Sequence, residues 1–359
     1  MTTAQIWMAG PSLTAPGGMS AVVTSYRDAG LFMAWQVRYL NTYDSPGLAV
    51  QLRTFGRAVV TLGWALLRGR VAVLHVHSAS RGSCWRKSVL CGMARLAGVP
   101  YLFHIHSGEF PVFFEGECGP LARRWIRSTC RHAQAVVVLT ASWQVALQRL
   151  MPAARFVVLP NPVKLPALAP AWRASHTRLL FLGRVRQKKG AFDLLRAMVA
   201  VAAAVPAVTL VMAGDGEIAA AQALCVGLGL AGRVHFTGWI EGADKDRAMR
   251  DADIFVLPSY FEGLPIGVLE AMAAGLVVVA SPVGGIPDLV TDGVEASLVP
   301  AGDVPGLAAA LVRLLESNDA ANALAGAAWL RVQAYDVNGV VARLGQLYSR
   351  ALKSRRGGA

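Results

Sequence analysis

Two glutamates stand eight residues apart in a segment that combines a loop with the start of a helix. Glu262 follows a strand-like apolar run, Ile254–Leu257, and Glu270 follows Pro265, a residue that often opens a helix. The pattern predicts a loop that carries Glu262 and a helix that carries Glu270 one and a half turns from its start. Free backbone N–H groups at a helix N-terminus favour phosphate, and neighbouring carboxylates can hold hydroxyl groups. The segment therefore indicates a site for a ligand with both a phosphate and a sugar.

A basic segment after another strand-like run predicts a second contact to phosphate. The run Arg178–Leu182 is followed by Gly183, after which Arg184 and Lys189 precede Gly190 and a helix. Side-chain cations beside a helix start can hold a phosphate group.

A divalent metal could supply the same charge, but the sequence does not favour one. Asp251 and Asp253 have the spacing of an Asp-x-Asp metal motif, yet they precede the buried strand Ile254–Leu257 instead of following one. The five cysteines form no C-x-x-C pair and have no metal-ligand spacing. We therefore expect no metal and no cofactor.

Both segments resemble the retaining glycosyltransferases of family 4, which have two Rossmann-like domains in the arrangement called GT-B. The signature of that family is a pair of glutamates separated by seven residues, the spacing of Glu262 and Glu270. The resemblance implies that Glu262 meets the donor sugar and that Glu270 binds the ribose. It also implies that Arg184 and Lys189 take the place of a metal. The matching residues beside Glu262, which we expect to bind substrate, are Gly263, Leu264 and Pro265.

Glycine-rich and linker segments add further candidate binding residues. Gly17 and Gly18 follow the opening strand and precede a helix, where they could seat either the donor diphosphate or the acceptor. Asn161, in the linker, and Gly214, after a strand of the second half, resemble residues that line the cleft of the family. Taken together, the matches extend over nearly the whole chain.

Two histidines end a strand in the first half of the chain. His104 and His106 lie on the same face of that strand. Family members often carry a histidine followed directly by glycine here, and the resemblance implies that it faces the reacting sugar. In this sequence Ser107 separates His106 from the glycine. The assignment therefore stays open between the two histidines, and we favour His106 because it is nearer to the end of the strand.

The elements that position these residues alternate between short β-type runs and helical runs. This is the pattern of parallel sheets with crossover helices. Four prolines from Pro160 to Pro170 predict an extended linker. The candidate strands are Ala4–Ala9, Val71–His77, Tyr101–His106, Ala135–Leu139, Phe156–Leu159, Arg178–Leu182, Val208–Ala213, Val234–Phe236, Ile254–Leu257 and Val277–Ala280.

We therefore expect an α/β protein with two Rossmann-like, doubly wound domains that face each other across a cleft. Residues 1–165 would bind the acceptor and residues 176–335 the nucleotide-sugar, and residues 336–359 would form a C-terminal helix with a basic tail. Gly227–Gly232 fits the pattern G-x-G-x-x-G, but it follows a helix and precedes a strand, which excludes a dinucleotide fingerprint.

Positive charge is concentrated in the first half of the chain. The net charge is +13, and residues 1–170 hold 17 Lys and Arg against 5 Asp and Glu. Such a surface attracts phosphate groups, and no nucleic-acid-binding motif accompanies it. The runs Gln51–Arg70 and Arg123–Arg131 mix arginines with tryptophan, as helices that lie in a membrane interface do. The alternative, helices that simply pack on the sheet, is equally compatible with these runs.

Membrane crossing is not expected. The uncharged run Ala197–Gly214 is interrupted by Pro206 and reads as helix, turn and buried strand. The N-terminus has no basic stretch ahead of an apolar run and so does not resemble a secretory signal. We expect a cytoplasmic protein, peripheral at the inner face of the cell membrane.

The predicted function is the transfer of a sugar from a nucleotide-diphosphate-sugar to a lipid-linked or polysaccharide acceptor, with no nucleic acid as partner. The resemblance implies attack on the face from which the diphosphate departs. Closure about the linker Pro160–Pro170 would exclude water. A nucleotide-sugar epimerase of the same architecture and a non-catalytic partner of another glycosyltransferase are the alternatives. An epimerase would change the sugar without any acceptor, and a non-catalytic partner would bind nucleotide without releasing any.

Overall fold

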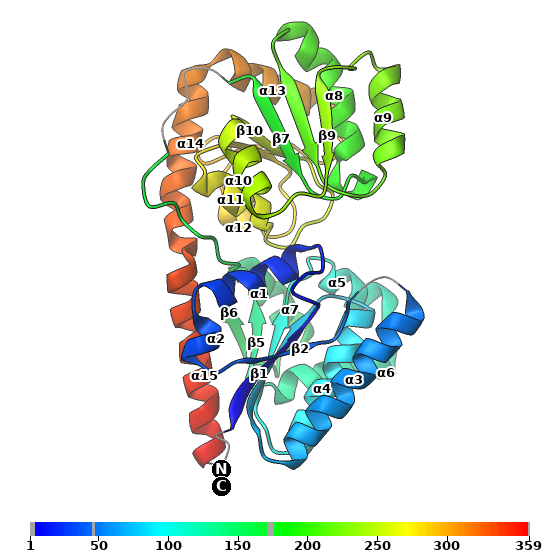
Figure 1. Cartoon of the computed structure of the whole chain (residues 1–359), viewed down its shortest axis with the longest axis vertical. Coiled ribbons are helices and arrows are strands. Elements are labelled where there is room, and N and C mark those ends of the chain that lie inside the picture. The colour runs from blue at the N-terminus through cyan, green and yellow to red at the C-terminus, as the bar shows by residue number, and fades with distance from the viewer. Residues whose placement is uncertain (1–3, 45–46, 171–175, 358–359) are drawn as a thin grey trace. The chain divides into compact units, whose positions relative to one another are not determined.

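The computed structural model describes residues 4–44, 47–170 and 176–357, and the chain divides into two compact units (Figure 1). The first unit comprises Met1–Pro162 and Val337–Ala359, and the second comprises Val163–Asp336. Each unit is built on a six-stranded parallel sheet with helices on both faces. The α/β fold with two doubly wound domains, predicted from the sequence, is confirmed.

The sheet of the first unit has the strand order β2-β1-β3-β4-β5-β6. Its strands are β1 (Gln5–Gly10), β2 (Arg38–Asn41), β3 (Val71–Ser78), β4 (Tyr101–Ile105), β5 (Ala135–Val138) and β6 (Phe156–Val158). Its helices are α1 (Gly18–Asp28), α2 (Leu31–Ala34), α3 (Leu48–Leu67), α4 (Gly82–Leu96), α5 (Phe110–Val112), a π-helical turn (Phe113–Glu117), α6 (Pro120–His132), α7 (Ala141–Leu150) and α15 (Val337–Gly357).

The sheet of the second unit has the strand order β12-β11-β10-β7-β8-β9. Its strands are β7 (Arg178–Leu182), β8 (Thr209–Ala213), β9 (Val234–Gly238), β10 (Ile254–Leu257), β11 (Val277–Ala280) and β12 (Ser297–Leu298). Its helices are α8 (Ala191–Ala204), α9 (Ile218–Gly227), α10 (Gly242–Asp251), α11 (Ile266–Ala273), α12 (Ile286–Leu289), α13 (Val304–Glu316) and α14 (Asn318–Val332), with 3₁₀ turns at Gln187–Lys189 and Gln333–Tyr335.

The central strands are buried on both faces. Every residue of β3, β4, β5, β10 and β11 is buried. Parallel strands covered by helices on either side read as continuous apolar runs. This arrangement accounts for the hydrophobic fraction of 54%. From the sequence alone, contact with a membrane was a second explanation for that fraction.

Strand order reverses direction once in each sheet, and ligands of doubly wound folds bind at the carboxyl ends of the strands at that point. In the first unit the reversal lies between β1 and β3, and in the second it lies between β7 and β10. The loops after these four strands carry most of the residues that the sequence singled out.

All ten strands expected from the sequence are present, but two more, β2 and β12, were missed. Both are short edge strands, and β2 has only one fully buried residue, so neither shows a continuous apolar run. The run Gly227–Gly232 begins at the last residue of α9 and precedes β9, in agreement with the predicted order of helix and strand. The run Ala197–Gly214 ends α8 and forms β8.

The last helix, α15, belongs to the first unit by its contacts. Tyr348 is fully buried there, and its hydroxyl lies 2.9 Å from Nδ1 of His75 on β3. Arg343 donates a hydrogen bond to the carbonyl of Val158 at the end of β6. The chain therefore passes between the units at Pro162–Val163 and again at Asp336–Val337. Among the described residues, none of the helices has both the length and the apolar character that spanning a bilayer requires.

Candidate active site

The strand-order reversal of the second unit brings Lys189 and Glu262 into direct contact. Nζ of Lys189 donates to Oε1 of Glu262 over 2.6 Å, and the hydroxyl of Ser259 donates to the same oxygen over 2.7 Å. Glu262 is only 8% exposed, so its carboxylate is nearly buried and is held by two donors. Two residues that the sequence chose separately, 73 positions apart, thus form one ion pair.

Close packing of the loops after β7 and β10 makes this contact possible. The backbone N–H of Tyr260 donates to the carbonyl of Lys188 over 3.0 Å. The hydroxyl of Tyr260 donates to Asp193 over 2.8 Å. Gly190 has a φ of +67°, and a Cβ there would lie 2.0 Å from the carbonyl oxygen of Pro258. Only glycine permits this approach, so Gly190 determines where Lys189 stands relative to Glu262.

Arg184 and Gly214 lie together where the loops after β7 and β8 meet. Nε of Arg184 is 3.3 Å from Oδ1 of Asp215, and both side chains are more than 40% exposed. A Cβ at Gly214 would lie 1.8 Å from the carbonyl oxygen of Gly183, so the two backbones touch. An exposed ion pair of this kind is weak. Arg184 is therefore available to an anion that arrives in this loop region.

Glu270 lies on α11, whose first residue follows Pro265. Oε1 of Glu270 accepts a hydrogen bond from Nζ of Lys245 on α10 over 2.5 Å, and each side chain is about one quarter exposed. The carboxylate is thus held in a fixed position and remains accessible. The sequence did not identify Lys245, because nothing in its spacing to Glu270 marks a pair that forms between two helices.

A third loop, after β11, supports the backbone around Glu262. The N–H of Gly285 donates to the carbonyl of Gly263 over 2.6 Å. Gly284 has a φ of +62°, and a Cβ there would lie 2.0 Å from the carbonyl oxygen of Glu262. Leu264 is 3% exposed, so its side chain is buried. These glycines were missed, although two adjacent glycines after a buried strand are a sequence signal for such a contact.

The reversal point of the first unit carries Gly17 and Gly18. Gly17 has a φ of +143° and precedes the first residue of α1, Gly18, and no side chain caps this helix. A Cβ at Gly17 would meet no described atom within 4 Å. The helix therefore presents an open N-terminus at the end of β1, as expected for a phosphate-binding position.

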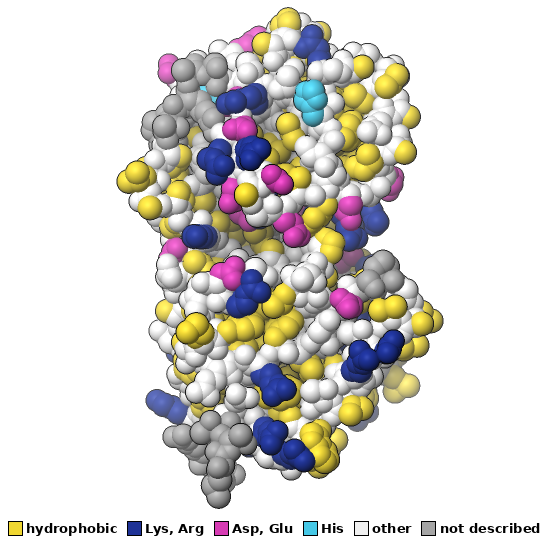
Figure 2. All heavy atoms as spheres, in the orientation of Figure 1, with side chains coloured by type: hydrophobic (Ala, Val, Ile, Leu, Met, Phe, Trp, Pro, Cys, Tyr) yellow, Lys and Arg dark blue, Asp and Glu magenta, His cyan; other side chains and the backbone are white. Residues whose placement is uncertain are grey.

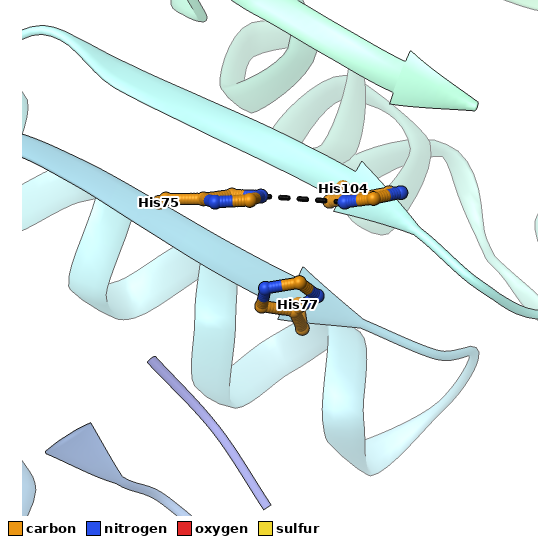
Figure 3. A group of neighbouring side chains, drawn as sticks. All are labelled: His75, His77 and His104. Atoms are coloured by element: carbon orange, nitrogen blue, oxygen red, sulfur yellow. Dashed lines mark hydrogen bonds between the residues drawn. The ribbon is translucent and has the colours of Figure 1, made fainter. Parts of the chain in front are cut away.

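Four histidines gather at the ends of β3 and β4 in the same unit. His75, His77 and His104, all fully buried, are drawn in Figure 3, where the rings of His75 and His104 lie edge to edge and that of His77 lies beside them. Nε2 of His75 is 3.3 Å from Nδ1 of His104, and Nδ1 of His77 is 2.8 Å from Nε2 of His106. Burial is the main cause that lowers the pKa of each ring, so all four are neutral at pH 7.

His106 is the member of this group that is not fully buried, and it lies just beyond the end of β4. Burial lowers its pKa to about 3, and a hydrogen bond with the side chain of Asn161 opposes that shift. Asn161 and His106, both singled out from the sequence, thus contact each other. His104 has no exposed surface. Of the two histidines left open by the sequence, only His106 has a surface that a ligand could reach.

The rings of His75, His77 and His104 could in principle hold a metal ion, because each offers one nitrogen within 4.8 Å of the others. Neutral imidazoles suit zinc and similar ions. His75 engages one ring nitrogen with Tyr348 and the other with His104, however. No carboxylate is among the groups that shift the pKa of these rings. The buried Lys87, in contrast, helps to lower the pKa of His77. The geometry is that of a hydrogen-bonded histidine array.

Two family descriptions of glycosyltransferases match the chain. The one described as "Glycosyl transferase 4-like domain" matches residues 11–162, and the one described as "Glycosyl transferases group 1" matches residues 176–317. A phosphatidyl-myo-inositol mannosyltransferase of Mycolicibacterium smegmatis is 30% identical over 293 residues, which are 79% of this chain and 72% of that protein. A glycogen synthase of Mycobacterium tuberculosis is 26% identical, over 84% of this chain and 78% of that protein.

Solved structures share the fold over nearly the whole length. Sucrose-phosphate synthase from Thermosynechococcus elongatus superposes with a TM-score of 0.82 at 20% identity and covers 98% of this chain and 100% of that one. The Anabaena protein HepE, solved in complex with UDP, has a TM-score of 0.74 at 20% identity and covers 96% of this chain and 99% of that one. With the two family matches and the 30% identical relative, these findings show that the chain belongs to the group 1, GT4-type glycosyltransferases of the GT-B fold.

Proposed function

We propose that this glycosyltransferase moves a sugar from a nucleotide-diphosphate-sugar to a lipid-linked or polysaccharide acceptor, with retention of anomeric configuration and without a metal ion. The observation that carries the proposal is the Lys189–Glu262 pair at the strand-order reversal of the second unit. A cation and a nearly buried carboxylate, on loops locked together by Gly190, suit a ligand with a charged and a hydroxyl-bearing part.

A nucleotide-sugar donor is supported by the chemistry of these loops. Arg184 and Lys189 place two positive charges on the loop after β7. Glu270 is held by Lys245 at a position suited to a ribose hydroxyl. The Anabaena HepE structures include complexes with UDP and with UDP-glucose. We assign the diphosphate to Lys189 and Arg184, the ribose to Glu270 and the donor sugar to Glu262.

The proposed mechanism follows from the charges. As the glycosidic bond lengthens, negative charge grows on the departing diphosphate, and Lys189 and Arg184 stabilise it. The acceptor hydroxyl attacks from the face that the diphosphate leaves, and its proton passes to a diphosphate oxygen. His106 is neutral at pH 7 because burial lowers its pKa to about 3. We assign it a hydrogen bond to the reacting sugar, since a neutral ring donates one without adding charge.

Independence from metal is part of the proposal because two cations, Lys189 and Arg184, are assigned to the diphosphate on which charge develops. If a divalent ion were needed as well, the side chains would be expected to offer it carboxylate ligands. Glu262 and Glu270 are instead each bound to a lysine, through Lys189 and Lys245. A chelator should therefore leave turnover unchanged, and loss of turnover that magnesium or manganese restores would contradict this part of the proposal.

A position at the cytoplasmic face of the membrane is proposed from the surface of α3 and α6. Exposed apolar side chains on these helices include Trp64 (54% exposed), Leu67 (83%), Leu121 (84%) and Trp125 (52%). Neither helix contains an acidic residue. Figure 2 shows yellow and dark-blue side chains interleaved on the lower right of the first unit, where Figure 1 places α3. Apolar and basic side chains on one helix suit the interface of an anionic bilayer.

The proposal is tested with a panel of nucleotide-sugars followed by proton NMR. Slow hydrolysis by water should release a nucleoside diphosphate from the true donor, and the first sugar anomer to appear should be that of the donor. Appearance of the opposite anomer would contradict retention. Conversion of the nucleotide-sugar into an epimer, with no diphosphate released, would identify an epimerase instead.

A further inference from the structure

Lys87 is a buried lysine, and no carboxylate is among the groups that shift its pKa. It lies on α4 and is 1% exposed. The charged or ionisable groups that shift the pKa of Lys87 are Arg86 and Cys84. Lys87 in turn lowers the pKa of His77 on β3, and none of these groups is a carboxylate. Within the described part of the chain, no hydrogen bond or ion pair involves Lys87. A buried charge without a partner is strongly disfavoured, so a lysine here points to an anion that binds it.

Arg86, the neighbouring cation, folds back toward the start of the same helix. Its Nη1 lies 3.3 Å from the position that a Cβ would take at Gly82, the first residue of α4. Its Nε is buried and has no hydrogen-bond partner among the described residues. The guanidinium carbon is 5.5 Å from the ring centroid of Tyr43, whose carbonyl accepts a hydrogen bond from Ser12 in the loop after β1. Arg86 thus joins α4 to the loop after β1.

The N-terminus of α4 completes the group. The helix has 15 residues, and no side chain caps its first turn. Side chains of an α-helix lean toward its N-terminus, so Arg86 and Lys87 extend in the direction that the free N–H groups face. Glu109 and Glu117 both form ion pairs with Arg81, the residue that precedes α4. The result is a cluster of donors and positive charge at the strand-order reversal between β1 and β3.

We propose that the α4 N-terminus, Arg86 and Lys87 form a phosphate-binding subsite that takes the phosphate or diphosphate group of the acceptor. This inference rests on the proposed function, in which the first unit binds the acceptor. Two cations and a helix N-terminus are the usual protein partners of phosphate. The donor diphosphate has its own cations in the second unit, Lys189 and Arg184. The acceptor class is therefore a phosphorylated or diphosphate-linked one, in preference to a neutral glycan.

The state of Lys87 supports an anion as ligand. Burial lowers its pKa to about 7, so the free protein holds this lysine partly neutral at neutral pH. A bound phosphate would restore the ammonium form, and binding would then take up a proton above pH 7. The neighbouring ring of His77 is neutral and can donate a hydrogen bond without competing for the anion.

Calorimetric titration of the full chain with inorganic pyrophosphate, at constant ionic strength, tests the subsite. The wild type should show two sites. Lys87→Met and Arg86→Gln should each weaken one of them by about tenfold or more, since hydrogen bonds to charged groups are lost. Lys189→Met should weaken the other, and Arg95→Gln, near the far end of α4, should change neither. Unchanged binding in Lys87→Met overturns the subsite, whereas unchanged binding in Lys189→Met counts against the proposed donor site.

Thermal unfolding separates a binding role from a packing role. Lys87→Met removes a buried charge and keeps the length of the side chain, so without pyrophosphate the variant should unfold at the same temperature as the wild type or a higher one. Pyrophosphate should raise the unfolding temperature of Arg95→Gln more than that of Lys87→Met. A Lys87→Met protein that is less stable but responds fully to pyrophosphate would show that Lys87 only fills the core.

The phosphate could belong to an acceptor molecule or to a membrane headgroup, and two probes distinguish them. Geranyl diphosphate, a water-soluble diphosphate with a short apolar tail, should bind with the same dependence on Lys87 as pyrophosphate. Vesicles with phosphatidylglycerol should retain Lys87→Met as well as the wild type, because membrane binding is assigned to α3 and α6 whereas Lys87 lies on α4. The reverse pattern, loss of vesicle binding with intact geranyl diphosphate binding, would overturn the assignment to the acceptor.

Discussion

Lys189 and Glu262 illustrate how single residues act in the second unit. In the free protein each neutralises the other over 2.6 Å, and Ser259 adds a second donor to the carboxylate. A diphosphate that approaches Lys189 competes with Glu262 for the ammonium group, which would free the carboxylate for sugar hydroxyls. In the proposed mechanism, the pair would therefore link arrival of the leaving group to exposure of the carboxylate that we assign to the donor sugar. The contact depends on backbone positions that tolerate no side chain at Gly190.

Replacement of Gly190 by alanine should destabilise the protein by about 2 kcal/mol or more and reduce turnover with it, because the Cβ would meet the carbonyl of Pro258 at a positive φ. Gly56→Ala is the matched control. Gly56 lies inside α3, and a Cβ there would have no described atom within 4 Å, so alanine should stabilise the protein by about 0.5–1 kcal/mol. Urea unfolding of both variants measures the difference, and equal stabilities would contradict the packing described here.

At the scale of elements, β3 and β4 hold the histidine array in a neutral state. His75 and His104 are joined by a 3.3 Å contact, His77 and His106 by a 2.8 Å contact, and Tyr348 of α15 contacts His75. Nε2 of His77 and of His104 are buried without a hydrogen-bond partner among the described residues. Protonation of any ring would place a charge in the sheet. The array should therefore make folding sensitive to acid.

Stability should fall as the pH drops below about 6.5. Unfolded histidines titrate near 6.5, whereas burial lowers the pKa of folded His75 and His106 to about 3 and those of His77 and His104 well below 6.5. Between pH 6.5 and 3 the unfolded chain binds more protons than the folded one, so each ring can contribute about 1.4 kcal/mol per pH unit. Lys87 adds little there, because below about 7 it is protonated in both states.

Urea unfolding at pH 6.5 and at pH 5.5 checks this slope with His104→Leu and His235→Gln. His104→Leu removes one buried ring and should reduce the loss of stability per pH unit by about one proton equivalent. His235 is exposed on β9, so its replacement should leave the slope unchanged. If the wild type loses no stability over this interval, the rings are not held neutral by burial.

At the scale of the whole molecule, charge and exposed apolar surface are both uneven. Residues 1–170 hold 17 basic and 5 acidic residues, whereas residues 171–359 hold 18 and 17. The exposed tryptophans Trp64 and Trp125 lie on α3 and α6, in the basic unit, and the guanidinium carbon of Arg68 is 4.1 Å from the ring centroid of Trp64. A basic surface with apolar side chains exposed on it is expected to bind anionic bilayers.

Flotation with vesicles tests this expectation. The wild type should float with phosphatidylglycerol vesicles at low salt and much less with neutral vesicles or at high salt, because screening weakens the attraction. Replacement of both Trp64 and Trp125 by serine should reduce flotation. Trp239→Ser is the control, since Trp239 is 39% exposed but lies in the second unit. Equal flotation with neutral and anionic vesicles would contradict an electrostatic contribution.

Most of the fold could be predicted from the sequence, because buried parallel strands appear in it as continuous apolar runs. Edge strands do not, and β2 and β12 were missed for that reason. The place of α15 could not be predicted either. Its buried face is visible in the sequence, but the contact of Tyr348 with His75 joins positions 273 residues apart.

The residues of the candidate site were singled out from the sequence, whereas their contacts became known only from the structure. Spacing identified Glu262, Glu270 and Lys189 individually, since each lies at a strand end or a helix start. Nothing local indicated that Lys189 would reach Glu262 or that Lys245 would hold Glu270, because such pairs depend on which loops the strand order makes neighbours. Lys87 was missed entirely. A lysine in an otherwise ordinary helix carries no signal until its burial is known.

The central claim is that Lys189 holds the diphosphate of the donor. It is tested most directly by titration of nucleoside diphosphates into the wild type, Lys189→Met and Lys188→Met. Lys188 is adjacent to Lys189 in the sequence, and its Nζ lies 5.2 Å from the centroid of the Phe261 ring. Each of the two variants therefore loses one positive charge, at neighbouring positions. We predict that affinity falls by about tenfold or more in Lys189→Met and by less than about threefold in Lys188→Met. Equal losses in the two variants, or none in Lys189→Met, would contradict the account.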